Sequence, residues 1–161
     1  MKSASIRELK KELQDRPPQE LAALCLRLCR FKKENKELMT YLLFEAHDEE
    51  AYVQSVKLEI DQRFEQVNRK SPYFVRKSFR SILQTTRKFI RYSSNKETEV
   101  ELLLHYCRHL KEFKPDIRKH KRLMGIHQKL TQQLDSKISA LHEDLHYDYR
   151  KELKKAGFQD V

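Results

Sequence analysis

The clearest catalytic motif in the chain is at residues 142–146, which spell H-E-x-x-H. Two histidines one helical turn apart, here His142 and His146, can bind zinc, and the glutamate of the motif can activate a metal-bound water. A catalytic zinc also needs a third protein ligand and a cleft. No strand is predicted that would hold a substrate, and the local apolar stripe centres near Leu145, which leaves both histidines on its flank. We therefore expect no metal and no cofactor. A zinc-dependent hydrolase using His142 and His146 is kept only as a remote alternative.

A second pair of histidines, His105 and His109, is also spaced by one helical turn. Both lie away from the apolar stripe of their segment, so the two histidine pairs are not expected to meet in one site. Cys107 lies on that stripe, where a core thiol is a better interpretation than a nucleophile. Cys25 and Cys29 lie four residues apart among leucines, and we expect them to be buried thiols. Three cysteines give no closed disulfide framework.

Other catalytic patterns are missing from the sequence. The chain has only two glycines, Gly125 and Gly157, so it has no glycine-rich phosphate loop. It also has no G-x-S-x-G nucleophile elbow. The paired carboxylates Glu49 and Glu50 are expected at a helix start, where negative charge is simply stabilising. The sequence therefore predicts that the protein is not an enzyme.

The strongest binding feature is a basic stretch that contains no acidic residue. Between Arg69 and Lys96 there are nine basic residues. On a helix, four arginines of this stretch fall within about 60° of arc and form a ridge about 22 Å long. Arginine suits phosphate because its planar fork donates two parallel hydrogen bonds. The candidate residues for anion or nucleic-acid binding are Arg76, Lys77, Arg80, Arg87, Lys88, Arg91 and, for stacking, Tyr73.

Two other interpretations of this basic face stay open. The first is an ordinary solvated surface. The second is neutralisation within the chain, because the preceding helix is rich in acids and is expected to pack beside the basic helix as a hairpin. Glu59, Asp61 or Glu65 could then face the arginines, and exposed ion pairs of this kind contribute only about 0–1 kcal/mol each. The basic residues 118–122 could instead widen the charged surface.

The leading functional hypothesis is a non-enzymatic helical binding or scaffold protein. A formal net charge of +10 suits an anionic partner, either a nucleic-acid backbone or an acidic protein. No recognition-helix motif, zinc finger or RNA-binding sheet is present, so nucleic-acid binding would be directed at the backbone and sensitive to salt. The alternative is a structural module that forms homo-oligomers through its C-terminal helix.

These residues must be positioned by helices. Residues that favour helices dominate the chain, and two glycines and four prolines are few for a protein with many tight turns. With 39% hydrophobic residues there is enough apolar material for a core. The helical spacing of these residues predicts an all-α protein without a β-sheet, folded as a short α-α superhelix or an irregular helical bundle. The seven predicted helices cover about residues 5–14, 18–31, 35–46, 48–67, 71–92, 95–113 and 116–155.

Two of these predicted helices are unusual. The last one would be about 60 Å long, with an apolar stripe that runs from Ile126 to Leu153. Gly125 could bend or split it, because glycine costs about 1 kcal/mol inside a helix. The third predicted helix is apolar on several sides, so we expect it to be central.

The length of 161 residues predicts a single all-helical domain over residues 1–161. Asn-Lys-Glu opens an apolar helix at 35–37 and again at 95–97. The repetition predicts an internal duplication of three-helix units 17–68 and 72–155, although the same capping chemistry used twice would also produce it. The stacked-hairpin pattern resembles HEAT-type helical repeats in its general layout only. No functional residue carries over from this resemblance.

The sequence also bears on membranes and location. No run of about 18 apolar residues occurs, so no transmembrane span is expected. The first residues are not followed by the apolar stretch of a secretory signal. We therefore expect no membrane partner and a cytoplasmic location.

Overall fold

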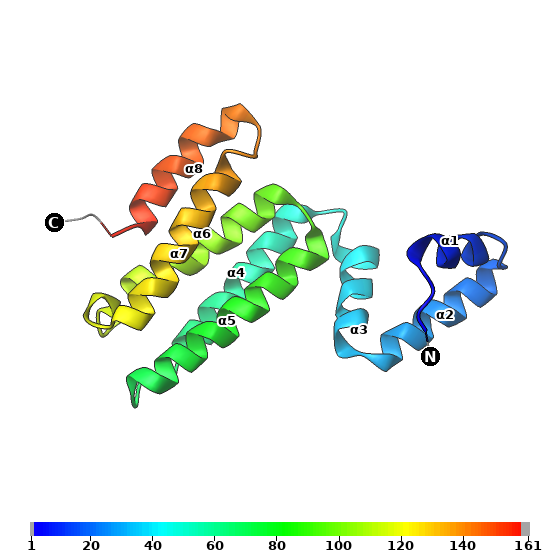
Figure 1. The fold of residues 1–161 in the computed structure, drawn as a ribbon, viewed down its shortest axis with the longest axis horizontal. Helices are drawn as coiled ribbons and strands as arrows, with labels where there is room; N and C mark the ends of the chain where they lie inside the picture. Colours follow the sequence, from blue (N-terminus) through cyan, green and yellow to red (C-terminus); the bar gives the residue numbers. More distant parts are fainter. Residues whose placement is uncertain (1, 159–161) are drawn as a thin grey trace. The chain divides into compact units, whose positions relative to one another are not determined.

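The computed structural model describes residues 2–158, and over this range all regular secondary structure is helical, with no strand (Figure 1). The all-α prediction is therefore confirmed. No helix of this range is long and apolar enough to cross a membrane. The α-helices are α1 (Ile6–Gln14), α2 (Pro18–Phe31), α3 (Lys33–Thr40), α4 (Glu49–Glu65), α5 (Pro72–Ser93), α6 (Lys96–Glu112), α7 (Lys121–Ile138) and α8 (Glu143–Ala156). A π-helical turn (Tyr41–Glu45) follows α3, and a 3-10 turn (Ile117–Lys119) precedes α7.

The C-terminal segment forms two helices, so the prediction of one long helix was wrong. The chain turns between Ile138 and α8, where the backbone N–H of Leu141 donates to the carbonyl of Ile138 at 3.0 Å. His142 then caps α8, because its side chain accepts a hydrogen bond from the N–H of Asp144. Gly125 lies inside α7, and an added Cβ there would meet nothing within 4 Å. Glycine therefore does not mark the break.

The chain divides into two compact units, one ending at Phe44 and one beginning at Glu45. The predictions of one domain over 1–161 and of duplicated units 17–68 and 72–155 stay predictions.

The first unit buries little of its own apolar surface. Among residues 2–44, no side chain of α1, α2 or α3 is buried, and only Tyr41, in the following turn, is. The expectation that the third helix is central was therefore wrong. Cys25 is exposed and Cys29 is half-buried, so the expectation of two buried thiols was wrong as well. A groove of about 710 Å³ runs between apolar side chains of α1 and α2. Its lining residues are Leu9, Glu12, Leu13, Arg16, Leu24, Arg27, Leu28 and Phe31.

The second unit is a two-layer stack of helices (Figure 1). In one layer α4, α6 and α8 run parallel. Contacts between neighbouring helices of this layer join residues 44 apart in the chain: Lys57 with Glu101 and Arg108 with Glu152. The helices α5 and α7 run in the opposite direction. The hydroxyl of Tyr52 on α4 donates to the carbonyl of Phe89 near the end of α5. This arrangement is the predicted short superhelix of stacked hairpins.

Helix α6 lies at the centre of this stack and packs on α4, α5, α7 and α8. Its fully buried side chains are Thr98, Val100, Leu102, Leu103, Leu104, Tyr106, Cys107 and Leu110. The hydroxyl of Tyr106 is satisfied inside the core, because it donates to the carbonyl of Phe79 on α5 at 2.8 Å. A central helix that is apolar on most sides is expected in such a stack.

We expect the three cysteines to react in an order set by burial. Cys107 is 0% exposed, and burial raises the pKa of its thiol to about 12, so almost no thiolate is present at neutral pH. Cys25 is exposed. Alkylation of the native protein should modify Cys25 quickly and leave Cys107 intact until denaturant is added, as followed by intact mass and peptide mapping. Labelling of native Cys107 as fast as Cys25 would contradict the placement of α6.

Candidate anion-binding surface

The basic face predicted from the sequence is carried by α5, the longest helix of the described residues. Ser71 caps the start of this helix, because its side chain accepts a hydrogen bond from the N–H of Phe74. Pro72 occupies the first helical position. It ends at Ser94, whose φ of 56° is left-handed and whose N–H donates to the carbonyl of Ile90 at 2.9 Å. A buried stripe fixes its rotation: Val75, Phe79, Ile82, Thr86 and Ile90.

With this stripe turned inward, the arginine ridge faces away from the core. Arg80, Arg87 and Arg91 are exposed, as is Lys77. Arg76 is half-buried beside them. In the part of the chain that the structure describes, none of the four arginines forms an ion pair with a carboxylate.

The acids of α4 are directed elsewhere, so the hypothesis of neutralisation within the α4–α5 hairpin was wrong for these arginines. Glu59 pairs with Arg63 one turn along α4, at 2.7 Å. Asp61 faces α6, where its Oδ1 lies against two histidines. Glu65 has no ion pair with α5. The cationic ridge is therefore directed to solvent rather than to its neighbouring helix.

Aromatic side chains stand at the N-terminal end of the ridge. Tyr73 is 58% exposed and Phe74 is 40% exposed, with their rings edge to face at 5.4 Å. The guanidinium of Arg76 lies 5.7 Å from the centre of the Tyr73 ring. At the other end, the ammonium of Lys88 lies 5.1 Å from the ring of Phe89. The face thus combines arginines that have no carboxylate partner with exposed aromatic surface.

The flank of α5 that meets α4 adds a shallow groove of about 270 Å³. It is lined by two cations and two hydroxyls, with one apolar residue at its floor: Arg63, Lys77, Ser78, Ser81 and Ile82. The sequence did not place Arg63 in this surface, because its contribution depends on how α4 and α5 pack.

The basic residues 118–122 do not simply extend the ridge. Arg118 is held by Asp116, with its Nε 2.8 Å from the carboxylate, and its guanidinium also lies over the ring of Phe158 at 5.6 Å. Two hydrogen bonds from Arg118 lower the pKa of Asp116, which is the signature of a tight local pair.

The two histidines of the H-E-x-x-H motif each contact nearby backbone. His142 stands before α8 as its cap, and its Nδ1 accepts from the N–H of Asp144 at 3.4 Å. His146 is one turn into the helix, with its Nε2 3.0 Å from the carbonyl of Leu141. Within residues 2–158, neither histidine belongs to a group of three candidate metal ligands.

The other histidine pair does meet a carboxylate, which the sequence did not reveal. His105 and His109 of α6 both direct Nε2 at Oδ1 of Asp61 on α4, at 2.5 and 2.6 Å. Burial alone would raise the pKa of Asp61, but hydrogen bonds from the two histidines hold it below its usual range. Burial lowers the pKa of His105, against the opposing effect of Asp61. Only the spacing of the two histidines was visible in the sequence, since their partner lies 44 residues before His105.

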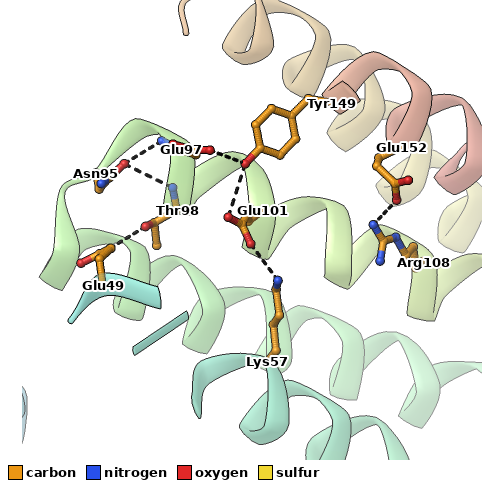
Figure 2. Close-up of polar contacts among 9 residues, drawn as sticks. All are labelled: Glu49, Lys57, Asn95, Glu97, Thr98, Glu101, Arg108, Tyr149 and Glu152. Atoms are coloured by element: carbon orange, nitrogen blue, oxygen red, sulfur yellow. Dashed lines mark hydrogen bonds and ion pairs between the residues drawn. The ribbon is translucent and has the colours of Figure 1, made fainter. Parts of the chain in front are cut away.

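Polar contacts within the layer of α4, α6 and α8 fix how these helices are aligned along their length (Figure 2). Lys57 pairs with Glu101 at 2.7 Å, and the hydroxyl of Tyr149 donates to Glu97 at 2.7 Å. Arg108 pairs with Glu152 of α8. Burial and the two nearby carboxylates raise the pKa of Tyr149, so its hydroxyl stays a donor. The charged groups of this network are paired with one another.

Comparison with family models, with curated proteins and with solved structures yields no match for this chain.

Proposed function

We propose that the protein is a non-enzymatic helical protein that binds single-stranded nucleic acid through the exposed face of α5. The observation that carries the proposal is the row of arginines without carboxylate partners on that face, within a stretch that has no acid from Arg69 to Lys96. Phosphate oxygens would supply the acceptors that these guanidinium groups lack in the protein. The forked geometry of arginine suits phosphate better than the point charge of lysine does.

The aromatic end of the ridge favours a single strand over a duplex. Proteins that bind single strands without sequence preference combine a cationic track for the backbone with exposed rings on which bases stack. Tyr73, with more than half of its surface exposed, and the adjacent ring of Phe74 provide such a platform beside Arg76. An acidic protein would meet the same cations but would make no use of stacking, and it is the second choice for this reason.

The structural alternative, a homo-oligomer built through the C-terminal helix, is the less favoured proposal. Part of the apolar stripe of that segment is buried within the second unit, where Leu134 and Ile138 are 0% exposed. That part of the stripe is therefore not free to pair with a second copy.

The proposal is tested with a triple variant, Arg80→Gln, Arg87→Gln and Arg91→Gln, and labelled oligonucleotides of about 12 nucleotides, single-stranded and duplex. Wild type should bind poly-T and poly-U strands with similar affinity and bind the duplex less tightly. The variant should bind at least about tenfold more weakly, and the slope of log K against log salt should fall by about two to three. Fluorescence anisotropy over a salt series measures both quantities.

The matched control removes three exposed charges from another helix, Arg7→Gln, Lys10→Gln and Lys11→Gln on α1. It changes the net charge equally, so it should bind nearly as wild type does if α5 is the binding face. Equal losses of affinity in the two variants would mean that net charge alone accounts for the binding, which would contradict the proposal. A wild-type affinity that does not change from low to high salt would also contradict it.

A further inference from the structure

We infer that Asp61, His105 and His109 form a binding site for a divalent first-row transition-metal ion, for which Zn²⁺ is the natural probe. The inference is independent of the proposed nucleic-acid binding, because it concerns the layer of α4 and α6 rather than the exposed face of α5. It rests on the convergence of three donor atoms of the kind that such ions prefer.

The three donor atoms already lie close to ligand geometry. Both Nε2 atoms contact the same oxygen of Asp61, and all three donors lie within 4.8 Å of one another. Ligands about 2.0–2.1 Å from a tetrahedral zinc lie about 3.3 Å apart. The histidine nitrogens would therefore move away from the oxygen by less than about 1 Å to admit an ion, which side-chain rotation can supply.

The surrounding structure holds the ligands in place. His105 and His109 lie one turn apart on α6, and Lys57 pairs with Glu101 one turn before the Asp61–His105 contact, which locks the register of the two helices. The ring of His109 stacks on Phe64, with centres 4.6 Å apart and planes inclined by 8°. Supporting contacts of this kind orient the coordinating side chains toward a metal.

The cluster is also open to solvent on one side. The exposed fractions of the three side chains range from 19% for His105 to 37% for Asp61, so an ion can enter. Asp61 and His109 line a cavity of about 300 Å³, and the carboxylates of Glu65 and Glu112 line the same cavity. Arg69 and Lys114 are the opposing charges there. A water or one of the two glutamates can complete a four-coordinate site, as in zinc sites with three protein ligands.

The ligand set also indicates which ions fit. Two imidazoles and one carboxylate suit zinc and its neighbours in the first transition row. Mg²⁺ and Ca²⁺ prefer shells of oxygen atoms, and this cluster offers only one protein oxygen at its centre. The site should therefore discriminate strongly against both of these ions.

Isothermal titration of the tag-free, metal-free protein with zinc chloride tests the inference, and native mass spectrometry gives the stoichiometry. We expect one Zn²⁺ per chain, an affinity at least about 100-fold weaker in the double variant His105→Gln and His109→Gln, and no binding of Mg²⁺. Asp61→Asn provides a second variant with little change in size, and it should also weaken binding. Circular dichroism establishes that each variant keeps its helix content.

The matched control is the double variant His142→Gln and His146→Gln, which removes the histidines of the H-E-x-x-H motif and leaves the Asp61 cluster intact. Its zinc affinity should equal that of wild type. The inference is overturned if wild type binds no zinc, if the control loses binding as much as the His105 and His109 variant does, or if neither Asp61→Asn nor that double variant weakens binding.

Discussion

Replacing Phe79 by alanine should lower the free energy of unfolding of the second unit by about 3–5 kcal/mol. Phe79 is 0% exposed and lies where α4, α5 and α6 meet. Its ring packs against Phe64 at 5.6 Å and edge to face against Phe113 at 4.9 Å. Since domains are stable by only about 5–15 kcal/mol, this one change should remove a large part of the total. Urea unfolding followed by circular dichroism measures the loss.

The matched control for this prediction is Phe74→Ala, on the same helix but with a ring that is 40% exposed. It removes the same number of atoms and should cost less than about 1 kcal/mol, as is usual for surface substitutions. The difference between the two losses in free energy of unfolding measures the cost of the cavity left in the core. If both variants lost the same stability, the rotation of α5 that turns the arginines to solvent would be wrong.

The helices were predictable because their signals are local. The predicted helices over 48–67, 71–92 and 95–113 start at Asp48, Ser71 and Asn95, and each of these side chains accepts a hydrogen bond from a backbone N–H in the first turn of its helix. The rotation of α5 was equally local, since its apolar and basic residues occupy separate arcs. The candidate anion-binding face could be named from the sequence for this reason.

Features that depend on packing were not predictable from these signals. The apolar stripe runs on in sequence across the turn between Ile138 and α8, although α7 buries its part of the stripe and α8 leaves Leu145 and Leu153 half-buried. The stripe therefore looks continuous although the chain reverses. The apolar residues of the first unit, such as Leu28 at 58% exposure, follow a helical period without being buried. Periodicity indicates which face is apolar and gives no measure of what covers it.

The two histidine pairs illustrate the same difference. His142 and His146 have the spacing of a known motif, yet His142 is a cap outside the helix and the two side chains bond to nearby backbone. His105 and His109 have no motif, yet they converge on Asp61 because α4 and α6 pack in parallel. The spacing between Asp61 and the two histidines is set by how two separate helices pack. A single sequence therefore shows no motif for this cluster.

Stability should also depend on pH through His127, a buried histidine of α7. His127 is 1% exposed, and its Nε2 lies 2.8 Å from the carbonyl of Ala156. Burial lowers its pKa, the carbonyl partly offsets this, and the charge of Lys111 lowers the pKa further. In the unfolded chain a histidine titrates near about 6.5. Below that pH His127 binds a proton in the unfolded state and not in the folded state.

The free energy of unfolding should therefore be highest above about pH 6.5 and fall as the pH drops from there toward the folded-state pKa of His127. This single group contributes at most about 1.4 kcal/mol per pH unit. His127→Gln keeps a donor for the carbonyl of Ala156 and removes the titration, so its unfolding free energy should vary less with pH over this range. Urea unfolding at a series of pH values, with a chelator present, measures the two slopes.

His47→Gln is the control variant, because it makes the same substitution at an exposed position. His105 also has a lowered pKa and titrates in the same direction, but it is present in all three proteins and cancels from the comparison. Equal slopes for wild type and His127→Gln would mean that His127 is reached by solvent in the folded state. The contact between α7 and the end of α8 would then be open, contrary to the packing described above.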